Sequence, residues 1–309
     1  MSRLRAAVAV AVAVGAGGLL AACGGGSPAA VSGSGVVNAV GAENQYADVI
    51  SQIGGRYVAV SAIESDPNTD PHTFEASASV ARELADARLV VLNGLGYDSW
   101  AQKILAASPS SGRKEIVAQT LLGLPDSTPN PHLWYDPSTM PAVAKAIAGD
   151  LSTLDPSHAA TFRANLSAFD ASLQPWFQAI AAFKVTSGGT PVAVTEPVAD
   201  YLLQALGADI RTPFSLQAAI MNGTDPSPED VATQQTLFKD HRVKVFVYNQ
   251  QVTDSLTQSF VSLAKSEGIP VVGVYETMPT PGYTYQTWML AETEAITKAV
   301  EHRVSTTHL

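Results

Sequence analysis

The chain has 309 residues, of which 46% are hydrophobic and 15% are charged, so it can bury a large core over two domains and is not disordered as a whole. A net charge of −10 with no basic stripe argues against nucleic acid as a partner. The single cysteine excludes a disulfide framework, and it excludes a zinc or iron–sulfur site built from several thiolates of one chain.

The first residues read as a targeting segment rather than as part of the fold. A short basic start precedes an apolar stretch at 6–20, and Leu20-Ala21-Ala22-Cys23 resembles a bacterial lipobox, in which the cysteine receives a lipid. The alternatives are an ordinary signal peptide with a chance cysteine, or a cytoplasmic chain with an apolar start. The position of the only cysteine favours the lipobox. We therefore expect a signal peptide at 1–23 and lipidation of Cys23.

A glycine- and serine-rich stretch follows Cys23 and predicts a flexible tether at 24–37. Such a tether lets a folded body stand away from the membrane that holds its first residue. We expect the protein to be anchored by lipid on the extracytoplasmic face of the cell membrane.

The body begins with alternating strand-like and helix-like segments. Because short apolar runs alternate with stretches of helical spacing, this part predicts a mostly parallel sheet covered by helices. Ser77 is a candidate cap for one of the helices. The strands are expected at 36–40, 58–63 and 89–94, and the helices at 45–53 and 77–85.

The middle of the chain predicts long helices. A helix at 141–151 ends before Asp155-Pro156-Ser157, and apolar residues then recur at three- and four-residue steps to about residue 183. We expect one long rigid helix over 156–187. It joins two α/β lobes, at 38–155 and 188–309.

The alternating rhythm restarts after residue 188, without a sequence repeat at a fixed period. It predicts a second α/β lobe built like the first. Its strands are expected at 191–195, 243–248 and 270–275, and its helices at 198–206, 255–267 and 288–300.

Two histidines stand in similar settings. His72 follows Pro71 and His132 follows Pro131, both in turn-rich segments, and a preceding proline stiffens a loop that presents a ligand. A loop histidine without a task is the alternative for each one alone. The remaining four are read as solvated surface residues: His158, His241, His302 and His308.

Two carboxylates follow apolar strands in the second half. Glu196 comes after 192–195 and Glu276 after 271–275, and ligands of open α/β sheets gather at the carboxyl ends of strands. Each alone reads equally as a helix cap or a solvated side chain. Together with the two histidines they form a His₂Glu₂ set, which suits zinc or manganese.

Several motifs in this order resemble a known family, the zinc- or manganese-type substrate-binding proteins of bacterial ABC importers (periplasmic solute-binding protein family 9, zinc-uptake group). The resemblance covers residues 38–302. It rests on Asp-Pro-His-Thr-Phe-Glu at 70–75, Leu-Asn-Gly-Leu-Gly-Tyr-Asp-Ser-Trp at 92–100, Asn-Pro-His-Leu-Trp-Tyr-Asp-Pro at 130–137, Thr-Glu-Pro-Val-Ala-Asp-Tyr-Leu at 195–202, Val-Tyr-Asn-Gln-Gln at 247–251 and Glu-Thr-Met-Pro at 276–279.

The resemblance implies a C-clamp of two α/β lobes with a metal ion in the cleft between them. His72 and His132 match the family's first two ligands, Glu196 matches the third, and Glu276 matches the fourth, where aspartate is usual. Whether Glu276 or instead a water or Asp136 completes the shell stays open. The histidine- and aspartate-rich loop of many zinc members is absent, which favours manganese, whereas the affinity order of divalent metals favours zinc.

The expected function is capture of one Zn²⁺ or Mn²⁺ ion by a monomer and its delivery to the membrane permease of an ABC importer. No enzyme activity is expected, because four protein ligands fill a tetrahedral shell and leave no position for a catalytic water. The alternatives are a surface adhesin with a structural metal and a metallohydrolase with Glu196 or Glu276 as general base.

Overall fold

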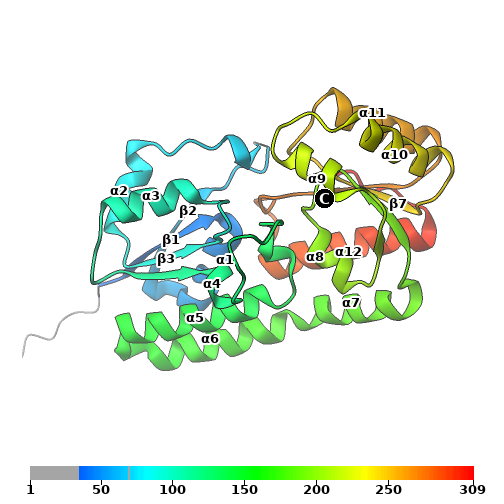
Figure 1. The fold of residues 1–309 in the computed structure, drawn as a ribbon. Coiled ribbons are helices and arrows are strands. Elements are labelled where there is room, and N and C mark those ends of the chain that lie inside the picture. The colour runs from blue at the N-terminus through cyan, green and yellow to red at the C-terminus, as the bar shows by residue number, and fades with distance from the viewer. Residues whose placement is uncertain (1–34, 69) are drawn as a thin grey trace, which may run out of the picture. The chain divides into compact units, whose positions relative to one another are not determined.

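The computed structural model describes residues 35–68 and 70–309, which build two separate parallel sheets (Figure 1). The predicted signal peptide, Cys23 and nearly all of the tether lie outside the described residues. The expected fold class is confirmed, since each sheet is wholly parallel and has helices on both faces.

The first sheet has the strand order β2-β1-β3-β4. Its register pairs Val37 with Val58, Ala39 with Leu89, and Leu89 with Lys114. The strands are β1 (Val37–Glu43), β2 (Val58–Glu64), β3 (Leu89–Leu92) and β4 (Lys114–Val117).

The second sheet has the order β6-β5-β7-β8, which is the same topology as the first. Buried parallel strands read as continuous apolar runs, and this explains why most strands were visible in the sequence. The edge strand β4, whose sequence is Lys-Glu-Ile-Val, and the two-residue β6 were not predicted. The strands are β5 (Pro191–Val194), β6 (Asp209–Ile210), β7 (Val245–Asn249) and β8 (Val271–Val274).

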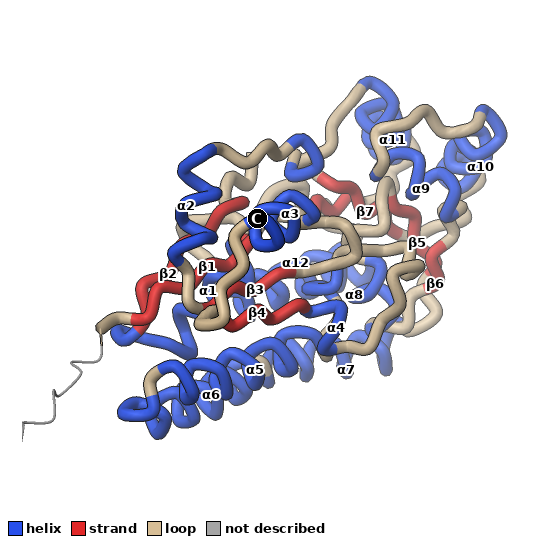
Figure 2. The backbone as a smooth tube through the Cα atoms, turned by 60° about the vertical axis from the view of Figure 1, so that its left-hand side comes forward, coloured by secondary structure: helices blue, strands red, loops and turns tan. Residues whose placement is uncertain are grey.

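Helices cover both faces of each sheet (Figure 2). Apolar residues from alternate strand positions pack on α2 and α3 on one face of the first sheet, and on α9, α10 and α11 on one face of the second. The helices are α1 (Asn44–Gly54), α2 (Ala78–Asp86), α3 (Ser99–Ala107), α4 (Ala118–Leu121), α5 (Thr139–Leu154), α6 (Ala159–Ser172), α7 (Gln174–Ser187), α8 (Asp200–Ala205), α9 (Phe214–Met221), α10 (Pro228–Lys239), α11 (Ser255–Ser266) and α12 (Tyr285–His302).

The segment between the sheets is not the single helix that the sequence predicted. A short 3-10 turn at Pro156–His158 precedes α6, and Leu173 separates α6 from α7. Pro175 lies at the start of α7 and has no N–H to donate to the preceding turn. The periodic apolar face nevertheless continues, because Leu173 donates to the carbonyl of Phe169 at 3.2 Å and Phe177 donates to that of Leu173 at 3.1 Å.

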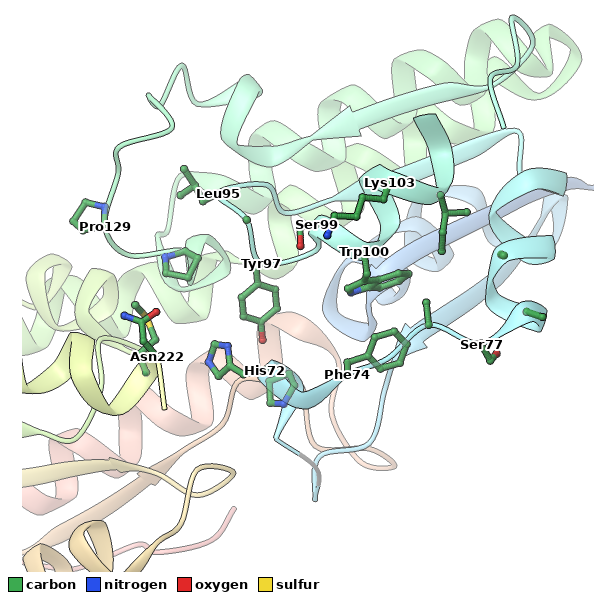
Figure 3. A pocket seen from close by; sticks show the side chains of 18 residues that line it. His72, Phe74, Ser77, Leu95, Tyr97, Ser99, Trp100, Lys103, Pro129 and Asn222 are labelled. Carbon is green, nitrogen blue, oxygen red and sulfur yellow. The ribbon is translucent and has the colours of Figure 1, made fainter. Parts of the chain in front are cut away.

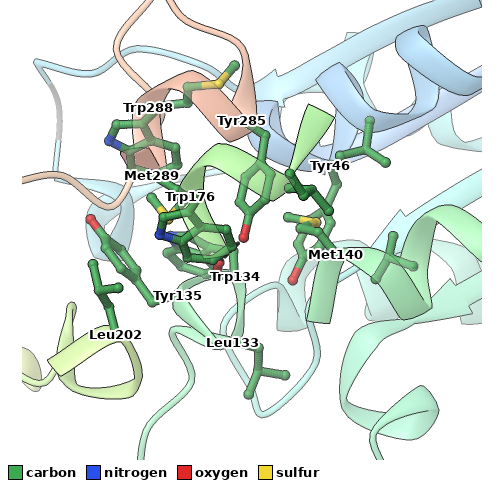
Figure 4. Packing of buried hydrophobic residues seen from close by; sticks show 14 of the residues in the cluster. Tyr46, Leu133, Trp134, Tyr135, Met140, Trp176, Leu202, Tyr285, Trp288 and Met289 are labelled. Atoms are coloured by element: carbon green, nitrogen blue, oxygen red, sulfur yellow. Dashed lines mark hydrogen bonds between the residues drawn. The ribbon is translucent and has the colours of Figure 1, made fainter. Parts of the chain in front are cut away.

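One hydrophobic core runs beneath both sheets and joins them. Trp134, Tyr135, Trp176, Tyr285 and Trp288 are all fully buried there, with most neighbouring rings edge to face (Figure 4). The hydroxyl of Tyr285 donates to the carbonyl of Trp134 at 2.6 Å, and the indole of Trp176 donates to Thr293 at 3.0 Å.

Hydrogen bonds also tie α1 to the segment at the start of α12. Asn44 exchanges two bonds with the backbone of Met278, at 2.8 and 3.0 Å, and Asp48 accepts from the backbone of Tyr285 at 2.8 Å. The two halves are therefore held by a shared core and by direct bonds. Among the described residues, no helix combines the length and apolar character needed to cross a membrane.

This packing predicts that Phe162→Ala is strongly destabilising. Phe162 on α6 is completely buried, so its truncation should lower the free energy of unfolding by roughly 3–5 kcal/mol. Val185 on α7 is 87% exposed, and Val185→Ala should change it by less than about 0.5 kcal/mol. Urea unfolding followed by circular dichroism measures both. Equal effects of the two substitutions would contradict the burial of Phe162 and the exposure of Val185.

Candidate metal centre

His72 lies in a short turn after β2. Asp70 caps the 3-10 turn Pro71–Thr73, because its carboxylate accepts from the backbone N–H of His72 at 2.8 Å. This local turn holds the imidazole above the second sheet's strand ends. The His72 side chain is 28% exposed, whereas those of His132 and Glu276 are wholly buried.

His132 is oriented by its neighbour Asn130. The side-chain oxygen of Asn130 accepts from the backbone N–H of His132 at 3.0 Å and lies 2.8 Å from its Nδ1. An amide oxygen only accepts, so Nδ1 carries a proton toward Asn130, and Nε2 is the nitrogen that faces Glu276. The amide nitrogen of Asn130 donates to the carbonyl of Pro197 at 2.7 Å, so the same side chain also reaches the turn of Glu196.

Glu276 is the centre of the cluster. Its Oε2 lies 3.3 Å from Nε2 of His72 and 3.1 Å from Nε2 of His132, and it accepts from the hydroxyl of Tyr97 at 3.0 Å. Its Oε1 accepts from the amide of Asn249 at 2.6 Å. One ligand atom from each of His72, His132 and Glu276 lies within 4.8 Å of the other two.

Glu196 stands outside that close group, although it is adjacent to it. Its Oε1 accepts from the amide of Asn249 at 3.2 Å, and the same amide serves Glu276. Its Oε2 is buried and has no hydrogen-bond partner among the described residues. The structure thus brings three of the four predicted ligands together. The fourth, Glu196, lies outside this group and is connected to Glu276 through the amide of Asn249.

Asp136 and the other four histidines do not join the group. Asp136 accepts from the backbone and hydroxyl of Ser138, at 2.8 and 2.7 Å, and so stabilises the start of α5. His158 contacts Asp155 at 2.6 Å and His241 lies 3.9 Å from Glu267. His302 and His308 are exposed near the C-terminus.

The charges of the cluster are mutually dependent. Burial lowers the pKa of the His72 imidazole, but its contact with the Glu276 carboxylate outweighs burial and raises the pKa to about 9. Burial keeps the pKa of His132 below its usual value. Burial opposes ionisation of Glu276, yet the two imidazoles hold its pKa well below the usual range. Without metal, the site therefore contains a protonated His72 paired with an ionised Glu276.

Glu196 has the opposite protonation. Burial and the nearby Glu276 carboxylate raise the pKa of Glu196 well above its usual range, so the metal-free site favours its protonated form. A cation in the site would offset the negative charge of Glu276 and so favour the ionised form of Glu196.

Further carboxyl groups lie buried behind the site, at the carboxyl ends of the first sheet's strands. Glu43 ends β1 and Glu64 ends β2, paired in register, and Asp98 accepts from the backbone after β3. Burial raises the pKa of Glu43 well above its usual range, that of Glu64 to about 8 and that of Asp98 to about 6. None of these side chains forms an ion pair with a lysine or arginine among the described residues.

A groove of about 890 Å³ lies beside the cluster and opens to solvent, and His72 and Tyr97 are among the residues that line it (Figure 3). Figure 3 shows Phe74 and Trp100 on one side of these two residues and Asn222 on the other. Of the three clustered side chains, His72 is the one that lines the groove.

Three polar residues of the site were not singled out from the sequence, namely Tyr97, Asn130 and Asn249. The signal for Asn249 was present, because it ends the apolar strand β7 just as Glu196 and Glu276 follow β5 and β8. Asn130 stands two residues before His132, where a side chain can bond the backbone locally. Tyr97 carries no such signal, since only the folded chain brings its hydroxyl to Glu276.

The sequence matches the model of one protein family over residues 40–299, the zinc-uptake complex component A periplasmic (ZnuA) family. It is 29% identical over 130 residues to the manganese-binding lipoprotein MntA of Halalkalibacterium halodurans, which is 41% of this chain and 43% of that one. It is 26% identical over 162 residues to the metal ABC transporter substrate-binding lipoprotein ScbA of Streptococcus cristatus, 48% and 52% of the two chains. The chain therefore spans about half the length of the curated relatives it matches.

Solved structures show the same fold. The solute-binding protein FpvC of Pseudomonas aeruginosa in complex with Mn²⁺ has a TM-score of 0.71 at 21% identity and covers 86% of this chain and 99% of its own. A mutant of the laminin-binding adhesin Lmb of Streptococcus agalactiae has a TM-score of 0.70 at 22% identity, with 86% and 100% covered. The matched family is one of solute-binding proteins and not of enzymes, as expected from the sequence. Because the family model matches most of the sequence, this chain belongs to the zinc-uptake complex component A periplasmic family.

Proposed function

We propose that the protein captures one divalent transition metal ion, zinc or manganese, and delivers it to the membrane permease of an ABC importer. The observation that carries the proposal is the convergence of two imidazole Nε2 atoms on one buried carboxylate oxygen, that of Glu276, between the two sheets. Buried imidazoles and a carboxylate that point at one another are the usual donors for these metals.

The spacing of the donors supports this proposal. A tetrahedral zinc ion with ligands at about 2.0–2.1 Å places its ligand atoms roughly 3.3 Å apart. The two imidazole-to-carboxylate distances are 3.1 and 3.3 Å, so a metal can replace the proton between them with little movement. Rotation of Glu196 would bring its unpartnered Oε2 in as the fourth ligand.

Both metals fit this donor set. The affinity order of the divalent ions favours zinc, whereas two carboxylates and the absence of a histidine- and aspartate-rich loop favour manganese. Direct competition between the two ions decides which one the site prefers.

We further propose that Cys23 carries a lipid and that residues 24–37 tether the protein to the extracytoplasmic face of the membrane. The lipobox-like sequence supports this, as do the lipoprotein names of MntA and ScbA. In this proposal two lobes, residues 38–155 and 188–309, hold the metal between them and are joined by 156–187. The protein acts as a monomer whose partner is the permease.

A competitive titration tests the capture role. The full chain is kept in detergent, stripped of metal, and then titrated with zinc and manganese separately and together. One ion should bind per chain, and His72→Ala should abolish tight binding because it removes the accessible imidazole. His158→Ala is the matched control, since His158 lies outside the cluster and should leave binding unchanged. If chelation unfolds the chain, the metal is structural and the proposal fails.

Metal binding should release protons, because the metal needs neutral imidazoles and ionised carboxylates. At pH 7 we expect His72, whose pKa is about 9, to release one proton per ion, and the raised pKa of Glu196 adds to this count. Affinity should therefore rise with pH from 7 and level off above about 9. Calorimetry in buffers of different ionisation enthalpy measures the count. Glu196→Gln should lower the count, and an unchanged count would remove Glu196 from the shell.

Asn130→Ala should weaken metal binding by about 10- to 100-fold, since loss of the partner that orients a metal-binding histidine has effects of this size. The substitution frees Nδ1 of His132 and releases the bond to Pro197. Asn165→Ala provides the control, because the amide of Asn165 donates to the carbonyl of Ile53 and this residue belongs to neither the cluster nor its groove. Isothermal titration of both variants gives the comparison, and equal affinities would show that Asn130 does not orient His132.

A further inference from the structure

Glu292 is a completely buried acid on α12 that is not part of the metal cluster. Its Oε1 accepts from the indole of Trp288 at 2.7 Å and from the backbone N–H of Tyr275 at 3.3 Å. Its Oε2 lies 2.7 Å from the hydroxyl oxygen of Tyr135. Tyr275 immediately precedes Glu276, and Tyr135 belongs to the 3-10 turn that follows His132. Glu292 therefore touches both segments that carry buried members of the cluster.

A count of hydrogens assigns the charge of Glu292. The hydroxyl of Tyr135 has one hydrogen, yet its oxygen lies 2.7 Å from the carbonyl oxygen of Tyr275 and 2.7 Å from Oε2 of Glu292. A carbonyl oxygen has no hydrogen to give, so Tyr135 must donate to Tyr275. The contact between the Tyr135 hydroxyl oxygen and Oε2 of Glu292 is then a hydrogen bond only if Oε2 carries a proton.

We propose that Glu292 is a neutral carboxylic acid and a positioning residue, whose hydrogen bond to Tyr135 fixes the turn of His132 against the strand end that carries Glu276. The chain of bonds runs from Glu292 through the Tyr135 hydroxyl to the Tyr275 carbonyl, while Oε1 holds the Tyr275 N–H. The spacing of His132 and Glu276, which lie 3.1 Å apart, then depends on one proton at Glu292. The consequence for metal rests on the proposed function.

The surroundings of Glu292 favour this proton. Its hydrogen-bond partners come from three elements, namely Tyr135 in the turn, Tyr275 after β8 and Trp288 on α12, and none carries a positive charge. Glu276 also acts on Tyr135 by its charge. Because Glu276 is negative, it does not favour a negative charge on Glu292. Burial raises the pKa of Glu292 to about 8, in agreement with the count of hydrogens.

Two variants separate the proton from the side chain's bulk. In Glu292→Gln the amide N–H replaces the acid O–H toward Tyr135 and the amide oxygen still accepts from Trp288. Metal affinity at pH 7 should stay within about twofold of the parent, since hydrogen bonding is retained. Glu292→Leu removes the bonds and should weaken binding by about tenfold or more, the range found for residues that orient metal ligands. Glu294→Gln is the control, because Glu294 on the same helix is exposed and pairs with Lys298.

Two measurements on metal-free full chain in detergent test the proton itself. The infrared difference between the parent and Glu292→Gln should contain the carbonyl band of a protonated acid at pH 7, and this band should vanish above about pH 8. The parent's unfolding equilibrium should also change with pH. Because the pKa of Glu292 is higher in the folded than in the unfolded chain, folding takes up a proton between these two pKa values. The equilibrium constant for folding of the parent, relative to that of Glu292→Gln, should therefore fall about tenfold per pH unit as pH rises from about 4.5 to 8.

The outcomes are distinct. Absence of the acid band, or the same pH slope in Glu292→Gln and the parent, overturns the neutral acid. Parent-like metal affinity in a folded Glu292→Leu overturns the positioning role. If Glu292→Leu does not fold, tenfold weaker binding by Glu292→Gln would overturn that role instead. Failure of the parent to bind zinc or manganese contradicts the proposed function alone, because the infrared and stability measurements use metal-free protein.

Discussion

The structure depends on one buried carboxylate, that of Glu276, held between two imidazoles where the sheets meet. An isolated charge at this depth is costly, and here Tyr97 and Asn249 hydrogen bond to its two oxygens while His72 supplies the compensating charge. His72, Tyr97 and Glu276 come from segments that follow strands β2, β3 and β8, and Asn249 is the last residue of β7. Because every strand is parallel, their carboxyl ends bring these segments to one place. The fold thus makes a polar site at the point where two apolar sheets end.

The concentration of buried carboxyl groups in and behind the site favours a cation there. Glu43, Glu64 and Asp98 add buried carboxyl groups behind it. Burial raises their pKa values, and no lysine or arginine of the described residues pairs with them. Burial likewise raises the pKa of Glu196, so the metal-free site favours the protonated forms of these acids more than water does. A divalent ion at Glu276 provides positive charge that favours ionised carboxylates nearby. In the proposed function, capture of the ion and loss of protons are therefore one process.

The aromatic core explains how His132 and Glu276, which come from distant parts of the chain, are held 3.1 Å apart. Trp134, Trp176, Tyr285 and Trp288 fill the space beneath both sheets, and the bonds of Tyr135 and Glu292 connect the His132 turn to the end of β8. Close-packed interiors resist small displacements. The break at Leu173 in the linking segment does not weaken this connection, because α7 packs along α12 and takes part in the same core.

The parallel α/β class, most of the strands and the residue types of the site could be predicted from the amino-acid sequence alone. Apolar runs of four or five residues and prolines before histidines are local patterns, which a single chain displays. The sequence did not reveal the edge strands β4 and β6 or the helices α3, α9 and α10, which are short or weakly amphipathic and depend on packing. It also predicted an unbroken linking helix, which Pro175 interrupts.

Which groups meet depends on how the chain folds. Glu276 rather than Glu196 stands between the imidazoles, Asp136 bonds at the start of α5, and Tyr97 and Asn249 complete the contacts of the carboxylate. Protonation likewise could not be read from residue types, since the surroundings lower the pKa of Glu276 and raise those of Glu196 and Glu292. The reason is physical: distances between segments far apart in the sequence, and the burial that shifts each pKa, exist only once the chain has folded.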